Sequence, residues 1–355
     1  MKPTPVSLAQ ARRIAVRAQL LDGSADGVLE TVRRLGFLQI DPISTVAPPQ
    51  RLVLWSRLGP HDSAELDRLL WEERKLVEWG AFIWPIEDFP LIRARMRRRR
   101  GKQKYEQQGT EFLRRNARFK RHLLRELEER GPLLSREIEA DLMVSRDPHA
   151  WWGSRKVTLM LQLLEGRGVV AIVGRRGSQR LWDLAERWFP ETESIPWPEA
   201  ERLLAAKRFR ALGVRFENGG WRAHPDAEDG PMPSRVTFLS PFDRLIHDRD
   251  RAEALWDFRY RLRYSSICPR DGSPGATTLL RAGVEARCRQ ARPADAAPAA
   301  PAEASGPAPR MSRLVGTAMS EHVPRVLRKG PCERLDRLRY GGALAGASVG
   351  GRRRS

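Results

Sequence analysis

Cysteine is scarce in this sequence, and the three cysteines present are far apart. Cys268, Cys288 and Cys332 match none of the spacings that bind zinc. No apolar run approaches the roughly 18 residues that a membrane-spanning helix needs. The first residues, "MKPTPVSLAQARRIAVRAQ", lack the continuous apolar core of a signal peptide. We therefore expect a cytoplasmic protein with no membrane span, no metal site and no cofactor.

Acidic residues are too few to balance the basic ones. The chain has 44 Asp and Glu against 64 Lys and Arg, a formal net charge of +20. Such an excess favours a polyanionic partner, most simply nucleic acid. A basic surface that only keeps the protein soluble is the alternative. The 355 residues, 41% of them hydrophobic, suffice for more than one domain with a core.

The N-terminal region has a helical pattern interrupted by one short strand. Residues 7–20 form a helix with Ser7 as N-cap, and residues 26–35 form a second helix that stops at Gly36. Residues 50–57 and 63–76 also have a helical pattern.

The strand lies in "GFLQIDPIS" (36–44), where two polar residues alternate with apolar ones. Residues i and i+2 of a strand point to the same side, so Gln39 and Asp41 project together from an apolar wall. An aspartate before a proline is often only a turn or capping residue, and that reading stays open.

A basic run follows the aromatic segment "WGAFIWPIEDFP" (79–90). Four consecutive arginines in it are candidates for contacts with DNA phosphates: Arg97, Arg98, Arg99 and Arg100. A solvated helix face is the alternative. We expect Trp79, Trp84 and Trp152 to lie in a core or an interface.

Residues 111–190 have the clearest supersecondary pattern. Predicted helices at 111–131, at 133–142 with Ser135 as cap, and at 151–168 are followed by a predicted β-hairpin in "VVAIVGRRGSQRLWDLA". Three helices and a hairpin are the order of a winged helix. Its third helix would enter a DNA groove with Ser154, Arg155 and Lys156 near its start, and Arg175 and Arg176 would form the tip of the wing. A winged helix used for protein contacts or as scaffolding is the alternative.

Residues 199–214 are predicted to be the first helix of another such unit, and no recognition helix follows them. Residues 236–262 are predicted to form a strand, a turn and a helix. Beyond Tyr264 the composition becomes rich in Ala, Pro, Gly, Ser and Arg, with 16 Lys and Arg against 7 Asp and Glu. Composition alone predicts a disordered basic tail.

Four stretches resemble the winged-helix DNA glycosylases of the AlkZ/YcaQ family: "LQIDPIS", "GPLLSREIE", "RLWDLAERWFP" and "LSPFDRLIHDRDRAEALWDFRYRL". The resemblance covers roughly residues 5–262. It implies an α+β, mainly helical fold of tandem winged-helix units around double-stranded DNA. It also implies removal of N7- or N3-alkylated purines, and for some family members the unhooking of interstrand crosslinks. The family's catalytic motif, Gln-apolar-Gln or Gln-apolar-Asp, corresponds to Gln39-Ile40-Asp41 here.

The chemistry of this pair suits such a reaction. An alkylated purine is cationic and leaves readily, so the transition state carries positive charge on the sugar. Asp41 could stabilise that charge and activate the attacking water, while Gln39 could position water or the sugar-phosphate. No metal is required. His247 could touch the sugar or a phosphate, or be a structural histidine bonded to a carboxylate. Ser240 and Asp243 are expected to stabilise a turn.

Two departures from the family pattern are expected. The first is an internal deletion after Val214, which would remove the recognition helix of the third unit. The second is a shift of reading frame near Arg263. The codons of residues 274–278, read from the third base of the proline codon, can encode Trp-Gly-Tyr-Tyr, a word that family members carry at this place. The residues after 263 would then have no selected function.

The expected domains are an N-terminal winged-helix-like domain with the catalytic motif (1–110), a second winged helix (111–195), a partial third unit with the start of a β-rich part (196–263), and the tail (264–355). A monomeric glycosylase is the leading hypothesis. A non-enzymatic winged-helix DNA-binding protein and an inactive glycosylase remnant are the alternatives. The sequence leaves the lesion preference open.

Overall fold

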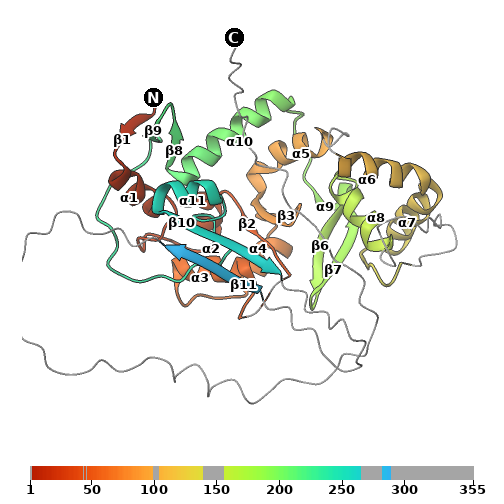
Figure 1. Ribbon diagram of the computed structural model, residues 1–355. Coiled ribbons are helices and arrows are strands. Elements are labelled where there is room, and N and C mark those ends of the chain that lie inside the picture. Colours follow the sequence, from red (N-terminus) through yellow and green to blue (C-terminus); the bar gives the residue numbers. More distant parts are fainter. Residues whose placement is uncertain are drawn as a thin grey trace, which may run out of the picture. The chain divides into compact units, whose positions relative to one another are not determined.

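The computed structural model describes residues 2–42, 44, 46–98, 104–138, 156–264 and 282–288. Helices predominate, and the strands form small antiparallel sheets (Figure 1). The predicted fold class, α+β and mainly helical, is confirmed. Within the described residues, no helix is both long and apolar enough to cross a membrane.

The first unit contains the Gln39 strand. Its elements are α2 (Val28–Leu35), β2 (Leu38–Gln39), α3 (Pro49–Leu58), α4 (Glu65–Trp71), β3 (Leu76–Trp79) and β4 (Phe82–Pro85). The sheet order is β2-β4-β3, so the first strand pairs with the last. Apolar side chains of all three helices and of the sheet share one core. The prediction of a helix over 63–76 was wrong at its end, because residues from Leu76 onward form a buried strand.

The second unit has the same sheet order, β5-β7-β6. Its elements are α6 (Lys104–Arg115), α7 (Ala117–Arg130), β5 (Leu133–Leu134), α8 (Lys156–Glu165), β6 (Val170–Arg176), β7 (Gln179–Leu184) and α9 (Ala185–Trp188). The predicted hairpin is confirmed. The single helix predicted over 111–131 is interrupted at Asn116, and Leu133–Leu134, predicted to begin a helix, form a strand that pairs with β7. Residues 139–155 lie outside the described residues.

The third sheet combines the N-terminus with a segment about 200 residues later. Its elements are β1 (Thr4–Val6), α1 (Leu8–Ala18), α10 (Trp197–Leu212), β8 (Val214–Glu217) and β9 (Gly220–Ala223). The order is again first strand, last strand, middle strand: β1-β9-β8 (Figure 1, where red β1 lies beside β9). We call this the split unit. In it α10 directly precedes the hairpin, the position that α4 and α8 hold in the other units. The prediction that residues 199–214 are the first helix of a unit was therefore wrong.

The remaining elements belong to none of these three units. They are η1 (Ile86–Asp88), α5 (Phe89–Arg98), α11 (Arg249–Trp256), β10 (Phe258–Tyr264) and β11 (Ala282–Cys288), the last two forming a two-stranded sheet. Helix α5 packs along α10, where Lys207 pairs with buried Asp88. The strand predicted at 236–239 is not formed, and Val236 and Phe238 are exposed.

Candidate functional site

The Gln39 strand is short and held on one edge by β4. Leu38 is paired with Ile83 and Gln39 with Phe82, and the Ile40 amide donates to the Ala81 carbonyl at 2.9 Å. The strand begins directly after α2, which ends at Gly36 in the left-handed conformation (φ 83°) that glycine adopts readily. The hydrogen-bonded strand ends at Gln39, so half-buried Asp41 lies just beyond it.

The alternation of side chains along this segment places Gln39 away from the first unit's core. Leu38 and Ile40 pack into that core, whereas Phe37 packs with a different aromatic cluster that includes Trp84. Because alternate residues of extended chain share a side, Gln39 lies on the same side as Phe37. This side is the one that the loop 240–248 approaches.

The amide oxygen of Gln39 is buried and accepts no hydrogen bond from the described residues. A buried acceptor without a donor costs about 1–3 kcal/mol. Such an atom therefore needs a specific explanation, and one explanation is that the oxygen binds a water molecule or the substrate. Its presence beside Asp41 makes this strand end the candidate active site.

Phe37 connects the strand to the loop 240–248. The guanidinium carbon of Arg244 lies 4.1 Å from the Phe37 ring centroid, and the His247 ring meets the same ring edge to face at 6.0 Å between centroids. Arg244 Nε also donates to the Leu35 carbonyl, at the end of α2, at 3.2 Å. Residues more than 200 positions apart in the chain are thus joined beside Gln39.

Burial lowers the pKa of both loop residues. Desolvation, with help from the nearby guanidinium of Arg244, lowers the pKa of His247 to about 4, so its imidazole is neutral at pH 7. Desolvation and the neighbouring Arg208 lower the pKa of Arg244 to about 9, which leaves it a cation at pH 7. His247 can therefore donate or accept a hydrogen bond but does not supply a positive charge.

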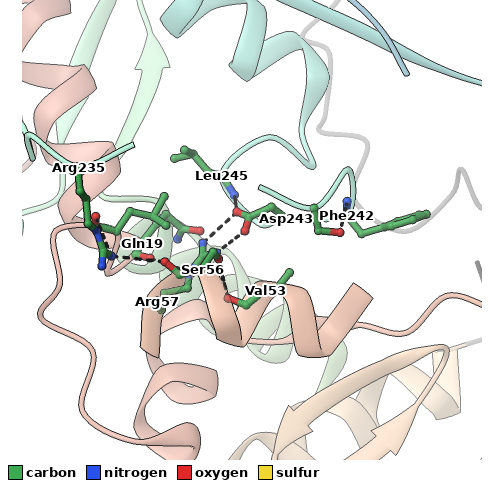
Figure 2. A network of polar contacts seen from close by, with 10 residues as sticks. Gln19, Val53, Ser56, Arg57, Arg235, Phe242, Asp243 and Leu245 are labelled. Atoms are coloured by element: carbon green, nitrogen blue, oxygen red, sulfur yellow. Dashed lines mark hydrogen bonds and ion pairs between the residues drawn. The ribbon is translucent and has the colours of Figure 1, made fainter. Parts of the chain in front are cut away.

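A buried ion pair anchors the same loop to α3 (Figure 2). Both terminal nitrogens of Arg57 donate to the Asp243 carboxylate, and both side chains are 0% exposed. Asp243 also accepts from the Leu245 amide at 2.9 Å, and Ser240 Oγ accepts from the Phe242 amide at 3.2 Å. Ser240 and Asp243 therefore stabilise a turn, as expected. Arg235 adds donors to the Leu21 and Ser56 carbonyls.

The predicted phosphate-contacting arginines of α5 lie near the N-terminal end of α10. Arg97 donates to Ser194 Oγ, and Arg98 stacks over Trp197 at 4.5 Å and pairs with Glu201 at 3.5 Å. Both arginine side chains are exposed. Arg99, Arg100, Ser154 and Arg155 lie outside the described residues, as does Trp152. Lys156 begins α8. Trp79 and Trp84 are buried, as predicted.

The predicted wing tip is partly occupied by internal ion pairs. Arg175 donates to both oxygens of Glu78 at 2.8 and 2.7 Å, and Arg180 Nε donates to the same carboxylate at 3.0 Å. The Glu78 side chain is 0% exposed. Arg175 thus joins the second unit's hairpin to β3 of the first unit. Arg176 is 60% exposed at its side chain and pairs with Glu137 at 3.0 Å.

Three contributors to this site were not singled out from the sequence. Phe37 lies two residues before Gln39, and Arg244 directly follows Asp243. This position next to residues that were singled out was the only sequence signal for Phe37 and Arg244. Arg57 lies in an ordinary amphipathic helix, and nothing in its local sequence marks its partner 186 residues away. Among the described residues, no group of three or more His, Cys, Asp or Glu side chains is placed to hold a metal ion.

Comparison with known proteins identifies the family. The family model of DNA glycosylase AlkZ-like proteins matches residues 32–215, just over half of the chain, including Gln39 and Asp41. The chain belongs to the AlkZ-like DNA glycosylase family. The resemblance inferred from the sequence motifs is confirmed.

The chain is also similar to a solved structure, the Streptomyces sahachiroi DNA glycosylase AlkZ. The TM-score is 0.46 and the sequence identity 17%, over 59% of this chain and 58% of that one. This AlkZ-like chain therefore spans somewhat more than half the length of the solved relative.

Proposed function

We propose that this AlkZ-like protein is a DNA repair glycosylase that hydrolyses the N-glycosidic bond of purines alkylated at N7 or N3. The observation that carries the proposal is the Gln39 strand end. There a buried amide oxygen that has no donor among the described residues lies on the side of the chain that faces the loop 240–248, two residues before a half-buried carboxylate. Membership of a DNA glycosylase family supports this reading of the pair.

The proposed reaction divides the work between these two residues. Asp41 stabilises the positive charge that develops on the sugar as the cationic base departs, and it takes a proton from the water that attacks C1′. Gln39 orients that water, because its unpaired amide oxygen can accept a hydrogen bond from a water O–H. The alkylated base leaves without needing a strong general acid.

Three winged-helix units are proposed to contact double-stranded DNA. Their shared sheet order supports this division, with the split unit taking its first strand and helix from the N-terminus. The basic residues proposed to contact the backbone are Arg97–Arg100, the start of α8 with Ser154, Arg155 and Lys156, and Arg176. Arg175, bonded to buried Glu78, is instead proposed to hold the wing in place. Unhooking of crosslinked purines, monomeric action and a cytoplasmic location belong to the same proposal.

The competing function is DNA binding without chemistry. A binding protein has no use for the Gln39–Asp41 pair, so base release separates the two. The test incubates the full chain with duplex DNA containing N7-methylguanine, or a nitrogen-mustard crosslink, and measures abasic product beside duplex affinity. Release above the spontaneous rate supports the glycosylase. Binding with no release supports a DNA-binding protein or an inactive remnant.

A further inference from the structure

Arg244 is a buried cation with no anionic partner among the described residues. It is 6% exposed, and its one hydrogen bond runs from Nε to a main-chain carbonyl, that of Leu35. Its guanidinium is stacked on Phe37 rather than paired. Arg57, equally buried, has a carboxylate on both terminal nitrogens. The contrast shows that this fold can pair a buried arginine and does not do so at Arg244.

Asp248, the acidic residue whose charge acts on Arg244, already has other partners. One oxygen of Asp248 accepts from Arg208 at 2.7 Å, and the other caps α11 by accepting from the Arg251 amide at 3.1 Å. Arg251 is also buried, and its terminal nitrogens donate to the Leu245 and Leu212 carbonyls. Asp248 thus interacts electrostatically with the guanidinium groups of Arg208, Arg244 and Arg251, so positive charge is in excess among these four side chains.

An unpaired buried charge is unfavourable, and an apolar side chain of similar length would avoid the cost. A bound anion would offset it. Arg244 is 6% exposed, and Nε is the nitrogen that has a partner among the described residues, which leaves the two terminal nitrogens without a hydrogen bond there. The guanidinium can therefore receive an anion through these two nitrogens while Phe37 and the Leu35 carbonyl hold its plane.

The position of Arg244 relates it to the proposed reaction. Phe37 and Gln39 are alternate residues on one side of extended chain, about 7 Å apart. In a nucleotide the sugar carries its phosphates on C3′ and C5′, a few bonds from C1′. A sugar placed with C1′ at Gln39 and Asp41 would bring one of these phosphates within reach of a cation stacked on Phe37.

We propose that Arg244 binds a backbone phosphate of the nucleotide whose sugar is held at Gln39 and Asp41. The planar guanidinium suits this ligand because two parallel N–H groups match two phosphate oxygens. This inference rests on the proposed function for the place of the sugar. The inference extends the proposed function because it assigns phosphate binding to a residue outside the proposed catalytic motif.

The test neutralises DNA phosphates one at a time. Duplexes with a tetrahydrofuran abasic analogue carry a single methylphosphonate at each position within three nucleotides of it. Affinity is measured for the wild type, Arg244→Met and Arg244→Lys. In the wild type, one position should weaken binding about tenfold. The same position should have no effect in Arg244→Met and most of its effect in Arg244→Lys.

A matched control distinguishes binding from folding. Arg251→Met removes another buried arginine of the same segment, one that is bonded only to carbonyls. It should lower thermal stability and keep the wild-type methylphosphonate profile. The proposal is overturned if no single phosphate matters in the wild type, a measurement that needs no variant, or if the sensitive position persists in folded Arg244→Met.

Base release is measured separately on N7-methylguanine duplex, which keeps the two claims apart. If base release is observed but no phosphate depends on Arg244, the proposed phosphate contact is wrong and the glycosylase activity is supported. If one phosphate depends on Arg244 but no base is released, the phosphate contact is supported and the proposed glycosylase activity is wrong.

Discussion

Asp243 accepts hydrogen bonds from both terminal nitrogens of Arg57 in a pair from which water is excluded. The pair fastens the loop 240–248 to α3 (Figure 2). Arg244 and His247 of the same loop contact the Phe37 ring. Through these contacts the Arg57–Asp243 pair connects α3 to the segment that includes Phe37 and Gln39.

Asp243→Asn should destabilise the protein strongly. Removing the carboxylate charge leaves the Arg57 guanidinium buried without compensation, a loss of about 3–5 kcal/mol. Urea unfolding followed by circular dichroism measures it. An Arg57→Met, Asp243→Leu double variant should regain a large part of the loss, since no buried charge remains. A single variant as stable as the wild type would show that the pair does not anchor the loop.

The two arginines at the wing should behave differently. Arg175→Ala leaves buried Glu78 with Arg180 alone and should cost about 1–3 kcal/mol of stability, with little change in the salt dependence of DNA binding. Arg176→Ala should keep stability within about 0.5 kcal/mol and reduce the slope of log affinity against log salt by about 1. Thermal melts and binding at several salt concentrations separate the two effects, and the reverse pattern would refute this division of roles.

His247 should make stability fall as the pH falls below 6.5. Its pKa is about 4 in the folded protein and near 6.5 in an unfolded chain, so the unfolded state binds the proton first. The stabilising effect is complete above pH 6.5 and is lost as pH falls through 4. Between pH 7 and pH 5 the wild type should lose about 2 kcal/mol more than His247→Gln. Equal losses in both proteins would show that His247 does not titrate this way.

The local stability of β9 should depend on the N-terminal strand β1, with which it pairs in the split unit. Deleting residues 2–6 removes the strand that pairs with β9 and uncovers part of the core around Trp221. Amide hydrogen exchange in residues 214–223 should then rise, because β9 becomes an unpaired edge. Exchange in the 170–184 hairpin serves as the internal control. Unchanged exchange in β9 would mean that β1 contributes nothing to the unit.

Local signals predicted those elements whose ends are determined by local chemistry. Ser7 caps α1 in a reciprocal capping box with Gln10, and Gly36 ends α2 with a positive φ, both as expected. The break at Asn116 escaped prediction, because apolar periodicity continues across it. There the side-chain amide donates to the Phe112 carbonyl at 2.8 Å, the acceptor that the Asn116 main-chain amide also uses at 3.0 Å.

Long-range pairing accounts for most of what the sequence did not reveal. Leu76–Trp79 is buried at every position and so lacks the alternation that identifies a half-buried strand. Glu78 and Arg175 are 97 residues apart in the sequence, and the paired strands β1 and β9 are separated by more than 200 residues. Gln39 and Asp41, the proposed catalytic pair, could be singled out because their spacing and their family motif are local, whereas the contacts of Arg57 and Arg244 form only in the folded chain.

The proposed glycosylase activity depends on the Asp41 carboxylate. The most direct test is the single-turnover rate of base release from N7-methylguanine duplex by the wild type, Asp41→Asn and the control Asp26→Asn, an exposed carboxylate of the same region. We expect Asp41→Asn to lower the rate by at least about 100-fold, with duplex affinity within about threefold of the wild type, and Asp26→Asn to change neither. Equal release by Asp41→Asn and the wild type would contradict it.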